Sequence, residues 1–242
     1  MFKGIASETT KSLPNAIITA TNSGSLAMDR DSFGGNPFAT ALIKSIGEEI
    51  RKTSELLQLL KTITEKQSNG RQTPDLLQIT NEPLVPFSVQ FNDASKIAMV
   101  MVYSDYSSSG INSLPGAEFD LKRIRKAIEE NGFECWALLD PTNLQFEANL
   151  KAFSKISNNY DFSILYVTGH GVEVANKIYL LPPSYKITYG KTALEAEALN
   201  IFTLINYQTS RRGNFLFYGG CRNDPFFYFL FNFFVKKGTH NQ

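Results

Sequence analysis

The feature that most constrains the fold of this sequence is the alternation of short apolar runs with segments of helical periodicity. Several of the runs are continuous in Ile, Leu, Val and Phe, which is typical of strands covered on both faces. The runs predict strands at Ala16–Thr21, Val85–Gln90, Lys96–Tyr103, Phe133–Leu139, Phe162–Val167 and Asn214–Tyr218. This alternation predicts an α/β domain built on a mostly parallel sheet.

Apolar residues at helical spacing separate these runs. They predict helices over Leu56–Ile63, Leu121–Ile128, Leu150–Ile156 and Leu194–Ile205. Thr53 or Ser54 is expected to cap the start of the first helix, and Asn131-Gly132 to end the second. Pro83 and Pro86 flank or interrupt the run at Val85–Gln90, so this strand is expected at a sheet edge.

Charge and cysteine content exclude several classes of protein. The net charge of +1 offers no general attraction to nucleic acid or to anionic membranes. Two cysteines cannot make a disulfide framework. Met1 to Pro14 is polar and lacks the apolar core of a signal peptide, and Phe226–Val235 is far shorter than the ~20 residues of a membrane span. These observations predict a cytoplasmic protein that binds neither nucleic acid nor membrane.

Two chemically active residues follow predicted buried strands. His170 lies in Val-Thr-Gly-His-Gly after Phe162–Val167, and Cys221 lies in Tyr-Gly-Gly-Cys-Arg after Asn214–Tyr218. Ligands and catalytic groups gather at the carboxyl ends of strands in an open parallel sheet. The spacing therefore predicts that His170 and Cys221 meet at one edge of the sheet.

This pair suits nucleophilic catalysis. An imidazole can take the thiol proton and later protonate a leaving amine, and the N–H groups of Gly171 and Cys221 are candidate oxyanion donors. The alternative is that Cys221 is a small core residue and His170 a satisfied polar one. Cys135 lies within a predicted strand without neighbouring glycines and is expected to be inert. No His/Cys cluster has metal-ligand spacing and no phosphate-binding glycine loop is present, so neither metal nor cofactor is predicted.

These motifs resemble those of the caspase-like peptidases, in particular the bacterial, metacaspase-like branch. Ile164–Gly171 is similar to the family's strand ending in Ser/Thr-Gly-His-Gly, and Phe215–Phe226 is similar to its nucleophile strand. Leu114–Asp120 resembles the turn that opens the family's first helix, and Leu180–Pro183 a Leu-Leu-Pro segment after the histidine. The separation of His170 from Cys221 also resembles the family's spacing of about 50 residues.

The resemblance implies a three-layer α/β sandwich around a roughly six-stranded, mostly parallel sheet. It implies a cysteine endopeptidase with a His170–Cys221 dyad, a protein or peptide substrate and no cofactor. In metacaspase-like members an acidic pocket holds Arg or Lys at P1, the residue on the amino side of the cut bond. Asp120 matches one pocket acid and Thr168 a small hydroxyl residue of the family, whereas Gly219 stands where a second acid is usual. A basic P1 preference follows, and Asn22 is expected to line the substrate groove.

The order of the segments differs from that of the family. Residues 1–91, with Ile17–Asp29, Gly35–Ile46 and Gln72–Leu77, resemble the small-subunit part that normally follows the nucleophile. Residues 97–226 resemble the large-subunit part, and residues 227–242 form an aromatic-rich tail. A single, circularly permuted domain over 1–242 accounts for this order. It predicts that Ala16–Thr21 pairs with Asn214–Tyr218.

Two other interpretations remain open. The chain could be a catalytically silent caspase homologue that acts as a binding or regulatory module. It could also be a fragment that spans the junction between two tandem copies of a caspase-like gene. The sequence gives no indication of the oligomeric state.

Overall fold

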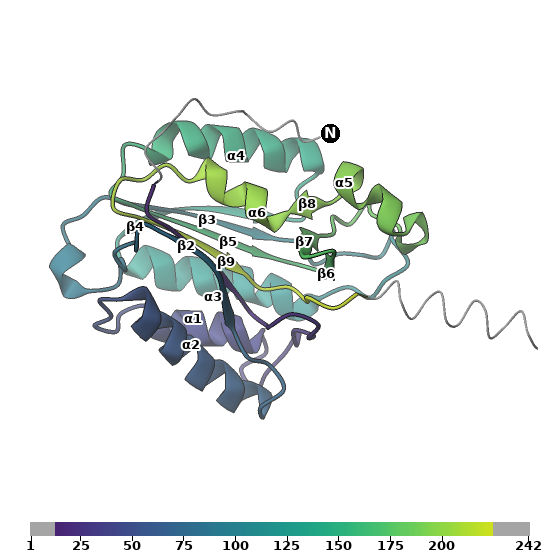
Figure 1. The fold of residues 1–242 in the computed structure, drawn as a ribbon, viewed down its shortest axis with the longest axis horizontal. Coiled ribbons are helices and arrows are strands. Elements are labelled where there is room, and N and C mark those ends of the chain that lie inside the picture. The colour runs from purple at the N-terminus through teal and green to yellow at the C-terminus, as the bar shows by residue number, and fades with distance from the viewer. Residues whose placement is uncertain (1–12, 225–242) are drawn as a thin grey trace, which may run out of the picture.

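A central sheet lies between two layers of helices (Figure 1) in a computed structural model that describes residues 13–224. The strand order is β2-β1-β9-β5-β3-β4. All neighbouring pairs are parallel except β1 and β2. The bounds are β1 (Asn15–Thr19), β2 (Asp75–Thr80), β3 (Lys96–Val102), β4 (Phe133–Leu139), β5 (Phe162–Thr168) and β9 (Gly213–Tyr218).

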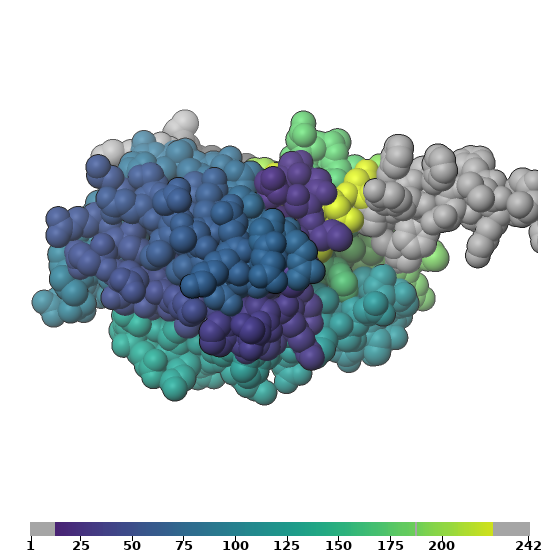
Figure 2. All heavy atoms as spheres, turned by 90° about the horizontal axis from the view of Figure 1, so that it is seen from below, coloured from purple at the N-terminus to yellow at the C-terminus, as the bar shows by residue number. Residues whose placement is uncertain are grey.

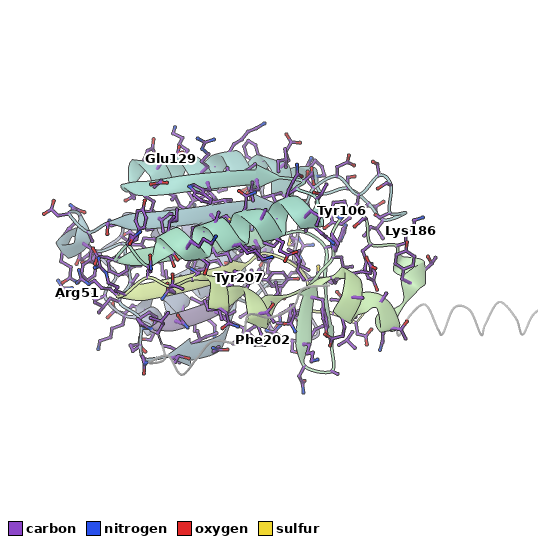
Figure 3. All side chains as sticks on the ribbon, turned by 90° about the horizontal axis from the view of Figure 1, so that it is seen from above. Arg51, Tyr106, Glu129, Lys186, Phe202 and Tyr207 are labelled. Carbon is purple, nitrogen blue, oxygen red and sulfur yellow. The ribbon has the colours of Figure 1, made fainter. Side chains whose placement is uncertain are left out.

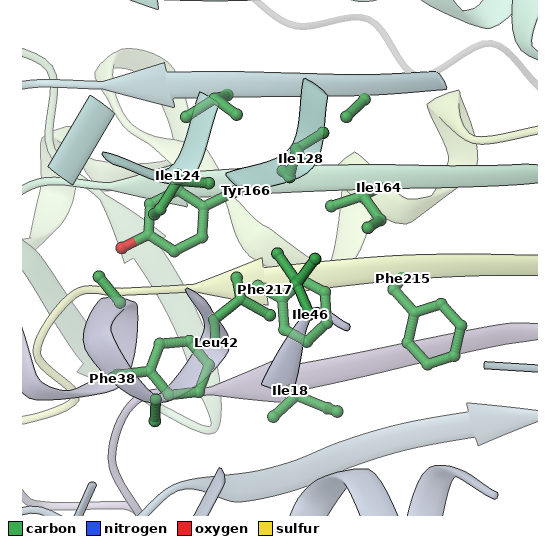
Figure 4. Close-up of a cluster of buried hydrophobic side chains, with 14 of the residues drawn as sticks. Ile18, Phe38, Leu42, Ile46, Ile124, Ile128, Ile164, Tyr166, Phe215 and Phe217 are labelled. Atoms are coloured by element: carbon green, nitrogen blue, oxygen red, sulfur yellow. The ribbon is translucent and has the colours of Figure 1, made fainter. Parts of the chain in front are cut away.

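Helices cover both faces of this sheet. One face carries α1 (Pro37–Ser45), α2 (Thr53–Ser68) and α3 (Pro115–Glu130), and the other carries α4 (Asn143–Ser157) and α6 (Ile201–Leu204). Side chains of each strand alternate between the two cores, because successive residues of a strand point to opposite faces. On β5, Ile164 and Tyr166 join the core under α1 and α3 (Figure 4), whereas Leu165 and Val167 join the core under α4. The predicted three-layer α/β sandwich with a six-stranded, mostly parallel sheet is confirmed.

A second, antiparallel sheet lies beyond the carboxyl ends of the main strands. It consists of β6 (Gly171–Val174), β7 (Lys177–Leu180) and β8 (Leu199–Asn200). The short helix α5 (Leu194–Glu197) precedes β8. The described residues also contain four 3₁₀ turns: η1 (Val89–Phe91), η2 (Ile187–Tyr189), η3 (Lys191–Ala193) and η4 (Ile205–Tyr207).

The predicted helix over Leu194–Ile205 is wrong as a continuous element. Leu199 and Asn200 pair with Leu180 and Tyr179 as β8, which divides the segment into α5 and α6. The Asn200 side chain then accepts a hydrogen bond from the amide of Phe202 at 3.0 Å and caps α6. Strand pairing therefore overrides the weak helical pattern here.

The predicted edge strand at Val85–Gln90 is also wrong. This segment is a turn followed by η1, and Pro86 has no N–H to donate to a ladder. The edge of the sheet is instead β2, which pairs with β1 and whose side chains are mostly half-buried. Of this strand, only Asp75–Leu77 falls within a segment predicted to resemble the family, and no strand was predicted there.

Of the two predicted helix ends, the end of α3 is confirmed and the N-cap of α2 is wrong. The α2 helix begins at Thr53, but its N-cap is Lys52 and neither Thr53 nor Ser54. The Glu55 carboxylate accepts a hydrogen bond from the Lys52 amide at 3.2 Å. The side chain of an acidic residue in the first turn thus caps the helix, in place of the predicted Thr or Ser hydroxyl. The α3 helix ends before Asn131 as expected, and the left-handed residue is Gly132, with φ of 79°.

The expected pairing of the first strand with the nucleophile strand is present. Strand β1 runs parallel to β9, with Thr19 beside Tyr218. The contact continues beyond the strands, because the Gly24 amide donates to the Arg222 carbonyl at 3.0 Å. The beginning and the end of the described chain thus lie side by side (Figure 2). The aromatic tail at 227–242 lies outside the described residues.

No helix within residues 13–224 combines the length and apolar character needed to cross a membrane.

Candidate active site

The site lies where β5 and β9 end at the same edge of the sheet. Val167 is paired with Tyr218 in this parallel ladder, and His170 and Cys221 each follow three residues later. The two loops touch: the Gly219 amide donates to the Val167 carbonyl at 2.8 Å. A Cβ built on Gly171 would lie 2.8 Å from the Cys221 carbonyl oxygen. The structure therefore brings the segments of His170, Gly171 and Cys221 together.

A main-chain carbonyl orients His170. Its Nε2 lies 2.6 Å from the carbonyl oxygen of Asn112. A carbonyl can only accept, so we assign the proton to Nε2, which leaves the Nδ1 lone pair as a base. Burial lowers the pKa of His170, opposed by the Asn112 hydrogen bond and by the charge of Asp29. The imidazole is therefore predominantly neutral at neutral pH, as a general base must be.

Asn112 was not predicted as a site residue, because its contact with His170 uses the backbone carbonyl and the sequence carries no side-chain signal for it. The loop that presents Asn112 is held at its start by Asp140. One Asp140 oxygen accepts the amides of Ser104 and Asp105 at 2.6 and 3.0 Å. Tyr106, on the same loop, packs its ring edge-on to His170 with 4.5 Å between centroids (Figure 3 labels Tyr106).

Cys221 is partly buried against a segment from the start of the chain. Its Sγ accepts the Ala27 amide at 3.2 Å. Burial raises the pKa of the Cys221 thiol, and the Ala27 hydrogen bond offsets part of that rise. The Cys221 thiol and the His170 imidazole are therefore each predominantly neutral at neutral pH. For Cys135, burial raises the pKa to about 12, as expected for an inert core thiol.

The residues expected to bind substrate occupy different environments. Asp120 is fully buried, and its carboxylate accepts the Asn36 amide at 2.8 Å and pairs with Arg123 at 3.2 Å. Burial raises the pKa of Asp120 to about 7 despite both partners. The expected groove residue Asn22 is exposed on the segment after β1.

Thr168 and Gly219 lie against each other. A Cβ on Gly219 would meet the Thr168 hydroxyl at 2.6 Å and the Tyr166 hydroxyl at 2.8 Å. These two hydroxyls fill the space that the Cβ of an acidic residue at position 219 would occupy. Asn36 links this region to Asp120, since its side-chain amide donates to the Gly219 carbonyl at 3.3 Å.

Arg222, directly after Cys221, contacts three parts of the chain. It is 5% exposed. Its Nε donates to Glu173 on β6 at 2.9 Å, and its Nη1 donates to Asp75 on β2 and to the Thr21 carbonyl, each at 3.0 Å. The guanidinium therefore connects the Cys221 loop to both sheets.

The part of the chain that the structure describes, residues 13–224, contains no group of three or more His, Cys, Asp or Glu residues able to hold a metal ion.

Comparison with known proteins agrees with this geometry. The family model described as the caspase domain matches residues 95–222, from the start of β3 through Cys221 and Arg222. A search of curated proteins gave no match. The family match covers more than half of the chain and includes both strands that carry the His170 and Cys221 loops. This chain therefore belongs to the caspase-domain family of peptidases.

Proposed function

We propose that this chain is a cysteine endopeptidase in which His170 and Cys221 act as a catalytic dyad. The observation that carries the proposal is the 2.6 Å contact between His170 Nε2 and the Asn112 carbonyl. It orients the ring and leaves Nδ1 able to accept a proton. Family membership supports peptide-bond hydrolysis as the reaction class.

The proposed reaction begins from the neutral pair. His170 Nδ1 takes the Cys221 proton as Sγ attacks the substrate carbonyl, so the thiolate forms only during attack. The oxyanion is stabilised by the N–H groups of Cys221 and Gly171. Within residues 13–224, the Cys221 amide has no hydrogen-bond partner, which supports this role. Protonated His170 then gives its proton to the leaving amine, and water attacks the thioester to release the second product.

The proposed specificity is for Arg or Lys at P1. Two carboxylates support it: Asp120, which the family resemblance assigns to the pocket, and Asp29, whose charge acts on His170. Asp29 is partly exposed, and Ala27 of the same segment contacts the nucleophile. A substrate guanidinium would reach Asp120 by taking the place of Arg123, with comparable charge-assisted hydrogen bonds.

The test uses electrophilic peptidyl ketones that differ only at P1. We expect a probe with Arg at P1 to modify Cys221 and leave Cys135 unmodified, as read by intact mass and peptide mapping. The Arg probe should react at least about tenfold faster than Leu or Asp probes, because an ion pair in a desolvated pocket is worth about 1.4 kcal/mol or more. Asp120→Asn should remove this advantage and leave the rate of the Leu probe unchanged.

Glu118→Gln is the matched control, because Glu118 lies on the same helix as Asp120 and pairs with Lys122 at the surface. It should preserve the order of the probes. Faster reaction of Asp or Leu probes would overturn the basic P1 preference. Failure of every probe to modify Cys221 in the folded protein would favour a catalytically silent homologue. The Ala27 main chain at Sγ and the raised pKa of Cys221 are the observations consistent with that second candidate.

We also propose that the segment order reflects a circular permutation. The parallel pairing of β1 with β9 supports it, because these strands are consecutive in unpermuted relatives. A rearranged chain that places residues 13–91 after residues 95–224, joined by a flexible linker, should fold as a monomer with the same probe reactivity. Dimerisation of the original chain through an exchanged β1, seen by sedimentation, would instead support the tandem-gene interpretation.

A further inference from the structure

Two buried tyrosine hydroxyls contact the main chain of the catalytic pair. The Tyr106 hydroxyl accepts the His170 amide at 2.9 Å and donates to the Leu181 carbonyl at 2.8 Å. The Tyr218 hydroxyl donates to the carbonyl of Cys221 at 3.0 Å. Each member of the pair is therefore held at its backbone by one tyrosine.

Glycines around the pair make room for these hydroxyls. A Cβ on Gly169 would lie 2.6 Å from the Tyr106 oxygen. On Gly171 or Gly220, a Cβ would collide with the Tyr218 hydroxyl. The glycines in both motifs thus serve close packing against tyrosine, and the two loops cannot shift without disturbing a hydroxyl.

Both hydroxyls are fully buried, and burial raises the pKa of each tyrosine well above its ordinary value. They therefore remain protonated over the working range of a peptidase. A buried hydroxyl is costly unless it is hydrogen-bonded, so both are expected to keep these contacts in the folded protein.

We propose that Tyr106 and Tyr218 are positioning residues that lock the backbones of His170 and Cys221 in the geometry needed for attack. This inference rests on the proposed peptidase activity. Neither hydroxyl needs to touch substrate: Tyr218 acts through the carbonyl of Cys221, and Tyr106 through the amide of His170. Small displacements of reacting groups have large kinetic effects, on the order of 10²-fold for about 1 Å.

The test compares Tyr218→Phe and Tyr106→Phe in the full chain with the fluorogenic peptide that the wild-type protein cleaves best. We expect kcat to fall at least about tenfold in each variant, with KM within about threefold, because the geometry of attack is lost while the substrate groove is retained. Circular dichroism and thermal unfolding establish that each variant is folded.

Tyr185→Phe is the matched control. Tyr185 is also buried, and its hydroxyl donates to the Gly190 carbonyl at 2.6 Å in a cluster beside the small sheet. This variant should keep the wild-type kcat. An equal loss in Tyr185→Phe would overturn the proposal, and so would wild-type kcat in a folded variant of Tyr106 or Tyr218. Failure of both tyrosine variants to fold would also overturn it, by making the hydroxyls essential to the fold. An inactive wild-type protein would instead refute the proposed function itself.

Discussion

Replacing either Cys221 or His170 by alanine is expected to abolish peptide cleavage while leaving the fold intact. We expect kcat/KM to fall by about 10⁴-fold or more, because each residue is needed for every step of proton transfer and thioester formation. Both side chains are partly exposed at the sheet edge, so truncation leaves no large cavity. The measurement is the rate of cleavage of the best peptide substrate, with folding followed by circular dichroism.

The double variant Cys221→Ala/His170→Ala should be no worse than either single variant, because the two residues act together. A much larger loss in the double variant would mean that they act independently and would contradict a dyad. Cys135→Ala is the control and should keep full activity, since Cys135 lies on β4 away from the site.

The pH profile of the wild-type protein gives a second measure of the same pair. His170 must be neutral to accept the thiol proton, so activity falls as the pH drops through its pKa. Because burial lowers that pKa, the acid limb should lie below the ordinary histidine value of about 6.5. A limb centred clearly above this value would contradict the assignment of His170 as the neutral base.

Arg222→Ala is expected to lower the free energy of unfolding by about 3–5 kcal/mol. The substitution leaves Glu173, whose side chain is 11% exposed, without its counter-charge. It also removes the contacts to Asp75 and to the Thr21 carbonyl that connect the Cys221 loop to β2 and to the segment after β1. Stabilities of single domains are only about 5–15 kcal/mol, so a large fraction of the total would be lost. Urea unfolding at neutral pH measures the change.

Arg211→Ala is the matched control, because Arg211 also pairs with a carboxylate but its side chain is 62% exposed. Exposed pairs contribute about 0–1 kcal/mol, so this variant should unfold close to wild type. Equal losses in the two arginine variants would show that Arg222 does not hold the loop. Arg222→Lys keeps the charge but not the planar, multidentate geometry, and an intermediate loss is expected.

Strand predictions agreed best with the structure where a strand is buried on both faces, because burial on both faces produces an uninterrupted run of apolar residues. Strands β3 and β5 are fully buried and match their predicted runs closely, because their residues are almost continuously apolar. The edge strand β4 also matches its predicted run, although most of its residues are only half-buried. Prediction failed where a contact distant in sequence decided the outcome. The half-buried β2 forms because β1 lies beside it, and Leu199–Asn200 extends because β7 is there to pair with it.

Sequence pattern alone was enough to predict the layered α/β architecture and the two glycine-flanked loops that carry His170 and Cys221. These features depend on residues adjacent in the chain and on the period of their apolar side chains. How these two residues are held depends on long-range contacts: the Asn112 carbonyl at His170, the Tyr106 and Tyr218 hydroxyls, and the ion pairs of Arg222. Every residue has a backbone carbonyl, so the sequence does not reveal which carbonyl accepts a given hydrogen bond. The identity of a tyrosine or arginine likewise does not reveal whether it is buried or which group it contacts. Which groups meet depends on strand order and register, and these are set by packing across the whole sheet.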